Sequence, residues 1–288
     1  MIRRAGPVLA AVALICGITA CGAEPRAVTG GSSSARAAGE CPVPDSGFEC
    51  DLQRRIVAAR DWVAGRPGEV GVVVRDRVTG ALWRNEHAGD PVWTASTIKL
   101  AMVVDLLVRR RAGEVELTDA DLALVDAMLH SSDDRAADEL WLRYGGPGHT
   151  AFNAAFGEYG MTSLTPQEGF GDTFPYWGFQ KCTADDLDRL MSFVLSSLPA
   201  EDREFVVRRM RSVGEEQRWG VWGAGPAAEP GTKNGWSLEV DGWVMNTVGF
   251  AGPGERYTLV VMNALGDQGG YDEGRETDTG VARLLFGP

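Results

Sequence analysis

An almost continuous apolar run, Leu100 to Val108, directly follows the tetrapeptide Ser96-Thr97-Ile98-Lys99. A run that is apolar on nearly every side predicts a helix buried in the centre of the fold. A lysine at the head of such a helix is costly to bury unless it is paired or functional. The sequence therefore predicts a polar site at the start of its central helix.

The spacing of Ser96 and Lys99 favours nucleophilic chemistry at this site. Residues i and i+3 of a helix lie on one face, so the amine is expected beside the hydroxyl. A serine is a poor nucleophile at neutral pH until a base takes its proton. A lysine can be that base if burial or a neighbouring cation lowers its pKa. From the tetrapeptide alone, the alternative that Ser96 only caps the helix stays open.

The N-terminus has the features of a processing signal. Two arginines precede a short apolar stretch and a small-residue cleavage site, which predicts a secretory signal peptide over 1–20. A cysteine at the next position resembles the bacterial lipobox, and this implies a diacylglyceryl anchor on Cys21. An ordinary signal peptide with an incidental cysteine is the alternative. Residues 21–44 form an Ala-, Gly- and Ser-rich tether, and 45–288 are expected to fold as one domain.

Charge and histidine spacing exclude several classes of function. The net charge is −12 and no basic stripe is present, so nucleic acid is not an expected partner. The histidines at 87, 130 and 149 are scattered without metal-ligand spacing. We expect no cofactor and no metal.

Cysteine usage is consistent with an oxidising compartment. Three cysteines, Cys41, Cys50 and Cys182, remain once the signal peptide and the lipidated residue are set aside. An odd number leaves one thiol over or one intermolecular bond. Cys41 can pair with Cys50 across a short loop, or Cys50 can pair with Cys182, and the spacing does not decide between them.

Tryptophans are frequent near the C-terminus, at positions 219, 222, 236 and 243. They are expected either to line a groove or to fill the core.

Hydrophobic periodicity predicts an α+β fold in which strands come from both ends of the chain. Asp241-Gly242 is a tight-hairpin signal between two of the strands. The expected sheet is antiparallel, and an all-helical subdomain is inserted between its halves. The expected helices are 51–64, 92–144, 150–159, 184–197, 200–211 and 278–286, and the expected strands are 69–78, 81–84, 231–240, 243–249 and 257–263, with 161–181 expected as a loop.

Two further motifs follow the S-T-I-K tetrapeptide in order. Ser132-Asp133-Asp134 lies between predicted helices, and Lys233-Asn234-Gly235 leads into a predicted strand. S-x-x-K, S-D-N and K-T-G in this order are the signature of class A β-lactamases and penicillin-binding proteins. From about residue 51 to 288, the chain therefore resembles the serine penicillin-recognising hydrolases, and class A β-lactamases in particular.

The resemblance implies roles for the matching residues. Ser96 would attack a carbonyl carbon, Lys99 would take its proton, and Ser132 would relay a proton to the leaving nitrogen. Lys233 would hold Lys99 near neutrality and attract a substrate carboxylate, with Asp134, Asn234, Gly235 and Trp236 lining the substrate site. The backbone N–H groups of Ser96 and Trp236 would stabilise the oxyanion.

Two positions depart from the signature. Asp134 replaces the amide that donates to a substrate carbonyl, and its carboxylate can raise the pKa of Lys99. Asn234 replaces a hydroxyl expected beside the substrate carboxylate, although an amide can still donate. Plain structural roles are the alternative: Ser132 in a helix cap, and Asn234-Gly235 in a type I′ turn.

Deacylation in this family needs a carboxylate that activates water. Glu168 is the candidate, and its partner position holds Asp172 rather than asparagine. Two carboxylates that share one water repel each other, so one of them is expected to become neutral. The alternative is that Glu168 is a solvated loop residue.

Together these features predict a monomeric, extracytoplasmic serine hydrolase that is anchored to the cell membrane through Cys21. The expected partner is a small-molecule β-lactam or a peptidoglycan-type peptide. The alternatives are a D,D-peptidase-like penicillin-binding lipoprotein and a non-catalytic envelope-binding lipoprotein with the same fold.

Overall fold

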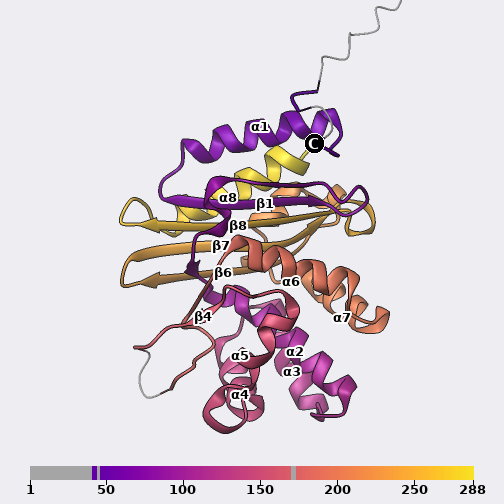
Figure 1. Cartoon of the computed structure of the whole chain (residues 1–288), viewed down its shortest axis with the longest axis vertical. Helices are drawn as coiled ribbons and strands as arrows, with labels where there is room; N and C mark the ends of the chain where they lie inside the picture. The colour runs from indigo at the N-terminus through magenta and orange to yellow at the C-terminus, as the bar shows by residue number, and fades with distance from the viewer. Residues whose placement is uncertain (1–40, 44–45, 170–172) are drawn as a thin grey trace, which may run out of the picture. The chain divides into compact units, whose positions relative to one another are not determined.

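A five-stranded antiparallel sheet organises the computed structural model, which describes residues 41–43, 46–169 and 173–288 (Figure 1). The strand order is β2-β1-β8-β7-β6. The N-terminal β1 pairs with the C-terminal β8, so both ends of the chain build the sheet, as predicted. The strands are β1 (Glu69–Asp76), β2 (Leu82–Arg84), β6 (Gly231–Glu239), β7 (Gly242–Ala251) and β8 (Tyr257–Gly266).

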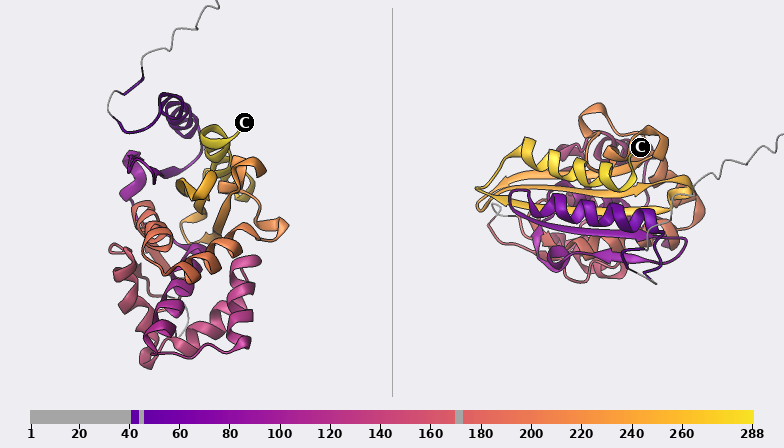
Figure 2. Two further views of the ribbon diagram at one scale, coloured as in Figure 1. Left: turned by 90° about the vertical axis from the view of Figure 1, so that its right-hand side faces the viewer. Right: turned by 90° about the horizontal axis from the view of Figure 1, so that it is seen from above.

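Both faces of this sheet are buried, and the side chains alternate between them with the period of two that a strand imposes. In β1, Val72 and Val74 pack with α1 (Cys50–Ala64) and α8 (Tyr271–Phe286), while Val73 joins the core on the opposite face. Figure 2 shows α1 and α8 side by side over one face. Two hydrophobic cores therefore lie back to back across the sheet.

The helical half packs around α2, whose residues from Ile98 to Leu107 are all buried. This confirms the prediction of a central buried helix. A short second sheet, β3-β5-β4, lies beside it. The helices of this half are α2 (Ile98–Ala112), α3 (Asp119–His130), α4 (Asp134–Tyr144), α5 (Ala151–Phe156), α6 (Ala184–Ser196) and α7 (Ala200–Arg211). Its short strands are β3 (Val92–Trp93), β4 (Thr165–Pro166) and β5 (Gln180–Cys182).

The structure corrects several predicted boundaries. The segment 92–144 does not begin as a helix, because Val92–Trp93 form a strand and Ala95–Thr97 a 3₁₀ turn. The expected loop 161–181 contains β4 and begins β5, whose pairing with β3 no local pattern announces. Helix α8 starts at Tyr271 rather than at 278. The predicted hairpin is present, with Glu239 opposite Gly242.

Cys41 and Cys50 form a disulfide, which decides between the two pairings that the spacing left open. Cys182 is a buried free thiol in β5. Its burial raises the pKa of the thiol well above the usual value. A Cys50–Cys182 bridge is therefore wrong. The predicted signal peptide, the predicted lipidation site Cys21 and nearly all of the predicted tether lie outside the described residues.

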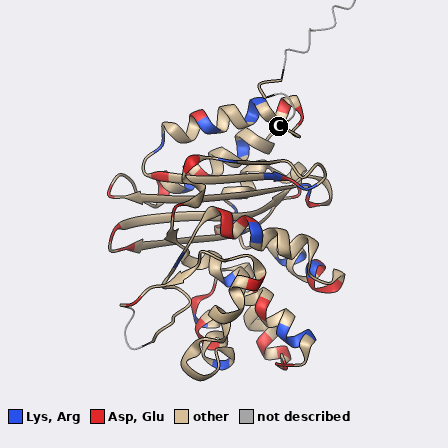
Figure 3. Ribbon diagram, viewed as in Figure 1, with Lys and Arg blue, Asp and Glu red and all other residues tan. Residues whose placement is uncertain are grey.

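Charge is distributed mainly over helices and strand ends, while most of the sheet ribbon is uncharged (Figure 3). This follows from the burial of both sheet faces. Among the described residues, no helix has the length and apolarity needed to cross a membrane.

Leu106→Ala should test the central position of α2. Leu106 is fully buried, so the free energy of unfolding should fall by about 2–5 kcal/mol through lost burial and a residual cavity. Leu142→Ala is the matched control, because Leu142 is 57% exposed and its loss should change stability by no more than about 0.5 kcal/mol. Urea denaturation measures both variants, and equal effects would contradict the assignment.

Candidate active site

Ser96 lies in a 3₁₀ turn, Ala95–Thr97, that directly precedes α2 and is held in place by hydrogen bonds. The preceding Ala95 has a φ of +43°, a conformation that is uncommon for a residue with a Cβ. Thr97 Oγ1 donates a hydrogen bond to the carbonyl of Thr94 at 2.6 Å, and Asn246 Nδ2 from β7 donates to the same carbonyl at 3.2 Å. The backbone of the nucleophile candidate is thus held by contacts from two elements.

Strand β6 passes directly against this turn at Gly235. A Cβ built on Gly235 would lie 2.7 Å from the backbone nitrogens of both Ser96 and Thr97. A glycine is required by this close approach rather than by a turn, so the type I′ alternative is wrong: Asn234 and Gly235 lie within β6. The edge strand and the Ser96 turn therefore form two walls of one site.

Ser132 lies between two buried lysines that come from different elements. Lys233 Nζ donates to Ser132 Oγ at 2.9 Å, and Lys99 Nζ lies 3.4 Å from the same oxygen. Lys99 also donates to the carbonyl of Ser132 at 2.6 Å. The backbone of Ser132 has a φ of +62°, and both of its oxygens accept hydrogen bonds from the lysines. The three motifs found in the sequence thus meet in space.

Asp134 forms an ion pair with Lys99 at the mouth of the site. Lys99 Nζ donates to Asp134 Oδ1 at 2.6 Å, and the side chain of Lys99 is fully buried while that of Asp134 is 71% exposed. The ammonium also lies 4.6 Å from the centre of the Trp177 ring, within cation–π range. A carboxylate, a carbonyl and an aromatic face together surround the Lys99 amine.

The two lysines have depressed pKa values for related reasons. Burial lowers the pKa of Lys99, while the hydrogen bond and charge of Asp134 act in the opposite direction. Burial also lowers the pKa of Lys233 well below its usual value, and the nearby charge of Lys99 lowers it further. Asp134 is therefore the group that most favours the protonated form of Lys99.

The expected nucleophile–base contact is not made directly. Within the described residues, no hydrogen bond joins Ser96 Oγ to Lys99 Nζ, because the amine is turned toward Ser132 and Asp134. A protonated Lys99 cannot accept the Ser96 proton. Lys99, the predicted base, is therefore paired with a carboxylate rather than with Ser96.

Asn234 and Trp236 project from the face of β6 opposite to Lys233. Asn234 Nδ2 donates to the carbonyl of Gln217 at 2.7 Å, and Asn234 Oδ1 accepts from Thr247 Oγ1 at 2.7 Å. The Asn234 amide is thus engaged away from Ser96, contrary to the expectation that it faces a substrate carboxylate. Trp236 can contribute to the site only through its backbone.

The C-terminal tryptophans mostly join an aromatic cluster behind β6 rather than a groove. Trp219 is buried, and the ring of Trp236 lies edge-on to both Trp219 and Tyr271. Trp243 also contacts Tyr271. Core packing is therefore the reading that the structure favours for this group.

Glu168 is exposed and makes no hydrogen bond or ion pair with the described residues. Its predicted partner, Asp172, lies outside the described residues. Trp177, which the sequence analysis did not single out, contacts Lys99 instead, and Asp138 Oδ1 accepts a hydrogen bond from its ring nitrogen at 2.8 Å. The aromatic content of 161–181 was the available signal, but only the fold brings this ring to Lys99.

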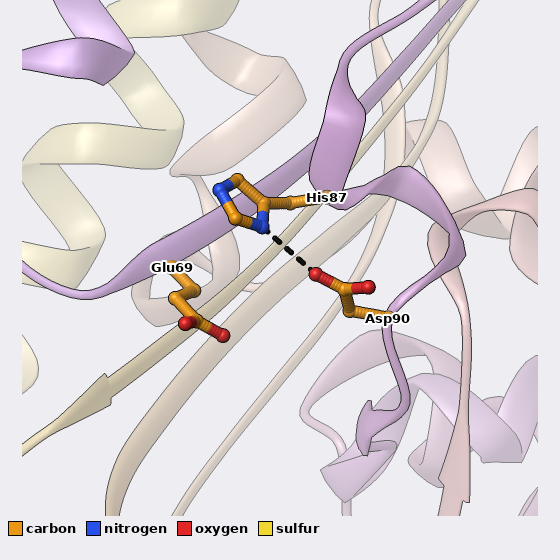
Figure 4. A group of neighbouring side chains, drawn as sticks. All are labelled: Glu69, His87 and Asp90. Atoms are coloured by element: carbon orange, nitrogen blue, oxygen red, sulfur yellow. Dashed lines mark hydrogen bonds and ion pairs between the residues drawn. The ribbon is translucent and has the colours of Figure 1, made fainter.

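One surface group combines three possible metal ligands. Glu69, His87 and Asp90 have ligand atoms within 4.8 Å of one another, and His87 Nδ1 lies 2.8 Å from Asp90 Oδ2 (Figure 4). The hydrogen bond to Asp90 raises the pKa of His87. Sequence spacing missed this grouping, because Glu69 comes from β1 and the other two from the turn after β2. Exposed carboxylates commonly gather in this way without an ion.

Comparison with known proteins relates the chain to a lipoprotein and to β-lactamase structures. "Putative lipoprotein LppW" from Mycobacterium tuberculosis is 31% identical over 229 residues, which are 76% of this chain and 70% of the relative, and the Mycobacterium bovis protein of the same name matches equally. No family model matches the chain.

Solved structures share the fold at low sequence identity. An ancestral class A β-lactamase has a TM-score of 0.66 at 18% identity, covering 81% of this chain and 98% of the other. A β-lactamase from Xanthomonas campestris has a TM-score of 0.67 at 17% identity, covering 82% and 97%. PBP-A has a TM-score of 0.65 at 19% identity, covering 81% and 94%. These matches confirm the predicted class A β-lactamase fold.

Asp134→Asn should lower the pKa of Lys99 further, because the carboxylate that opposes the effect of burial is removed. NMR titration of the lysine side-chain signals, with Lys99→Arg used to assign the Lys99 signal, measures the shift. Asp241→Asn is the control, since Asp241 pairs with Lys181 at 3.5 Å and not with the site. A Lys99 pKa that does not change in Asp134→Asn would refute the electrostatic assignment.

Proposed function

We propose that this chain, which belongs to the family of the mycobacterial lipoprotein LppW and has the class A β-lactamase fold, is a membrane-anchored serine hydrolase that forms an acyl-enzyme on Ser96. The observation that carries the proposal is the position of Ser132. Its hydroxyl contacts one buried lysine and lies near a second, beside a turn that presents Ser96 against the edge strand. Such a polar group is costly to build in a core without a function.

The geometry supports a balanced acylation sequence. Neutral Lys99 takes the proton of the Ser96 hydroxyl while Ser96 Oγ forms a bond to the substrate carbonyl carbon. The backbone N–H groups of Ser96 and Trp236 receive the developing oxyanion. Lys99 then returns the proton through Ser132 Oγ, 3.4 Å away, to the leaving nitrogen as the carbon–nitrogen bond breaks.

The proposed substrate is a β-lactam or a D-alanyl-type amide. Lys233 is expected to attract an anionic group on the substrate, because its side-chain nitrogen lies within the site and donates a hydrogen bond to Ser132. Either substrate class yields the same acyl-enzyme. A D,D-peptidase-like penicillin-binding protein differs from a β-lactamase only in how fast that intermediate is hydrolysed.

Slow deacylation is the expected behaviour. The proposed water-activating base, Glu168, is exposed and lacks a described partner, and the face of Trp177 contacts Lys99. General-base assistance is worth ~10²–10⁴-fold in rate. Without it, the acyl-enzyme should persist much longer than it takes to form.

The Lys99–Asp134 ion pair favours a second candidate, a non-catalytic lipoprotein that binds envelope fragments. A base that stays protonated leaves Ser96 unactivated. In that case, binding of peptidoglycan fragments should depend on Lys233, and Ser96→Ala should leave binding unchanged. Isothermal titration with purified fragments distinguishes this candidate from the hydrolase.

Ser96→Ala should abolish covalent labelling by a penicillin or an activated acyl ester, because the acceptor oxygen is removed. Intact-mass spectrometry should show one added acyl group on the native protein and none on the variant. Ser131→Ala is the matched control: Ser131 precedes Ser132 in the chain, but its hydroxyl donates to the carbonyl of Ala127 in α3. The absence of labelling by every β-lactam and acyl reagent would disprove the hydrolase proposal.

Stopped-flow kinetics with a chromogenic cephalosporin should show a burst of about one equivalent and then a slow steady state. Glu168→Gln should leave the steady-state rate within about twofold, because an unpositioned base contributes little of the usual ~10²–10⁴-fold. Fast linear turnover that drops sharply in Glu168→Gln would instead establish Glu168 as the base.

Cys21→Ser should move the protein from the membrane fraction to the soluble fraction and should abolish labelling by a fatty-acid probe. Cys16→Ser is the control, since the proposed cleavage removes position 16 with the signal peptide. If Cys21→Ser stays membrane-bound and acylated, the proposed anchor is wrong.

A further inference from the structure

Asp134 has one oxygen that is free for a ligand. Asp134 Oδ1 accepts from Lys99, and Oδ2 accepts no hydrogen bond from the described residues. The side chain is 71% exposed, whereas its lysine partner is fully buried. The ion pair thus joins a buried positive group to a negative group that meets solvent.

Two neighbouring carboxylates, Asp133 and Asp138, each use one oxygen in contacts within the protein. Asp133 accepts from the backbone nitrogen of Ala136 at 2.8 Å and caps the helix. Asp138 accepts from Tyr176 at 2.7 Å and from Trp177 at 2.8 Å. Each of the three carboxylates keeps one oxygen that accepts no hydrogen bond from the described residues, and Asp134 is the one of the three that forms an ion pair with Lys99.

The two lysines of the site are buried, whereas the carboxylate of Asp134 is exposed. Lys233 and Lys99 are buried, and each contacts or lies near Ser132 Oγ. Asp134 is the carboxylate that meets solvent beside them. A substrate whose acyl portion carries a cation can pair with Asp134, while its anionic portion is attracted to Lys233.

Resting on the proposed function, we propose that Asp134 selects acyl donors that carry an ammonium group and that this group activates Lys99 by taking over its carboxylate. A substrate ammonium can first bind the open Oδ2 of Asp134 and then compete with Lys99 for the carboxylate. Both groups make charge-assisted N–H hydrogen bonds to it, so one can replace the other. Asp134 then remains paired with one positive charge, because the substrate ammonium replaces that of Lys99. Lys99 can release its proton to solvent.

The balance of groups around Lys99 sets the direction of the effect. Asp134, Asp133 and Asp138, all from α4, raise the pKa of Lys99. Lys233 from β6 faces the same space, and burial opposes the charged form of both amines. Burial is already the largest influence on the pKa of Lys99, and withdrawing Asp134 removes the largest influence that opposes it, so the pKa falls further and neutral Lys99 is more available to accept the Ser96 proton.

A neutral acyl group brings no positive charge to replace the Lys99 ammonium, and an anionic one is repelled by Asp134. The ion pair then stays in place, and its carboxylate continues to favour the protonated form of Lys99. General-base help is worth ~10²–10⁴-fold, so a substrate that opens the pair should gain a substantial part of that range. Selection and activation thus follow from one carboxylate.

Three matched thioesters test the inference on the full folded domain: β-alanyl, N-acetyl-β-alanyl and N-succinyl-β-alanyl. The acylation rate constant of Ser96 should fall in that order, with at least about tenfold between the first two. The acidic limb of the pH–rate profile should lie at lower pH for the ammonium donor. Asp241→Asn, which alters a lysine-paired carboxylate elsewhere, should keep the order.

Asp134→Asn should remove the preference. The N-acetyl donor should react faster than it does with the native protein, and the three rates should converge within about threefold. Equal rates for all three donors on the native protein would overturn the inference while leaving the hydrolase proposal intact.

Failure of all three donors would count against the hydrolase proposal, and the inference would then be decided by binding. The Lys99 signal of Ser96→Ala would be titrated with β-alanine amide present and with its N-acetyl derivative present. A lower Lys99 pKa with the free amine alone supports the inference, and equal values overturn it.

Discussion

The burial of the Lys99 ammonium is the constraint on which the rest of the site depends. An isolated charge in a protein core is strongly unfavourable, so the head of α2 can be buried only where partners are supplied. The start of α4 supplies Asp134, the preceding turn supplies the carbonyl of Ser132, and the aromatic loop supplies Trp177. Two segments far from Lys99 in the sequence, residues 132–134 and the loop of Trp177, are therefore brought to one amine.

The Lys99–Asp134 ion pair has opposite effects on the stability of the fold and on the proposed chemistry. The carboxylate that makes the buried ammonium tolerable also raises the pKa of the proposed base against the effect of burial. An amide at position 134 would serve an acyl-transfer site without this conflict. The S-D-D departure is thus consistent with a site whose base becomes available only when Asp134 finds another partner, which gives a physical reason for a narrow choice of substrate.

The sheet supplies Lys233 to the site, and it also holds the turn that carries Ser96 in place. Gly235 lets β6 run against the Ser96 turn, and Asn246 from β7 holds the carbonyl beneath it. Strand alternation then decides which neighbours take part. Lys233 faces Ser132, whereas Asn234 faces Gln217 and Thr247 behind the strand.

The sequence by itself determined the buried α2, the α+β order and the three motifs, because these are written in local periodicity and spacing. It could not determine that Lys99 bonds to Asp134 rather than to Ser96, or that Trp177 lies over the amine. It also could not choose the Cys41–Cys50 pair or foresee the short β3-β5-β4 sheet. These depend on contacts between distant segments, and only the packing of the folded chain sets their distances.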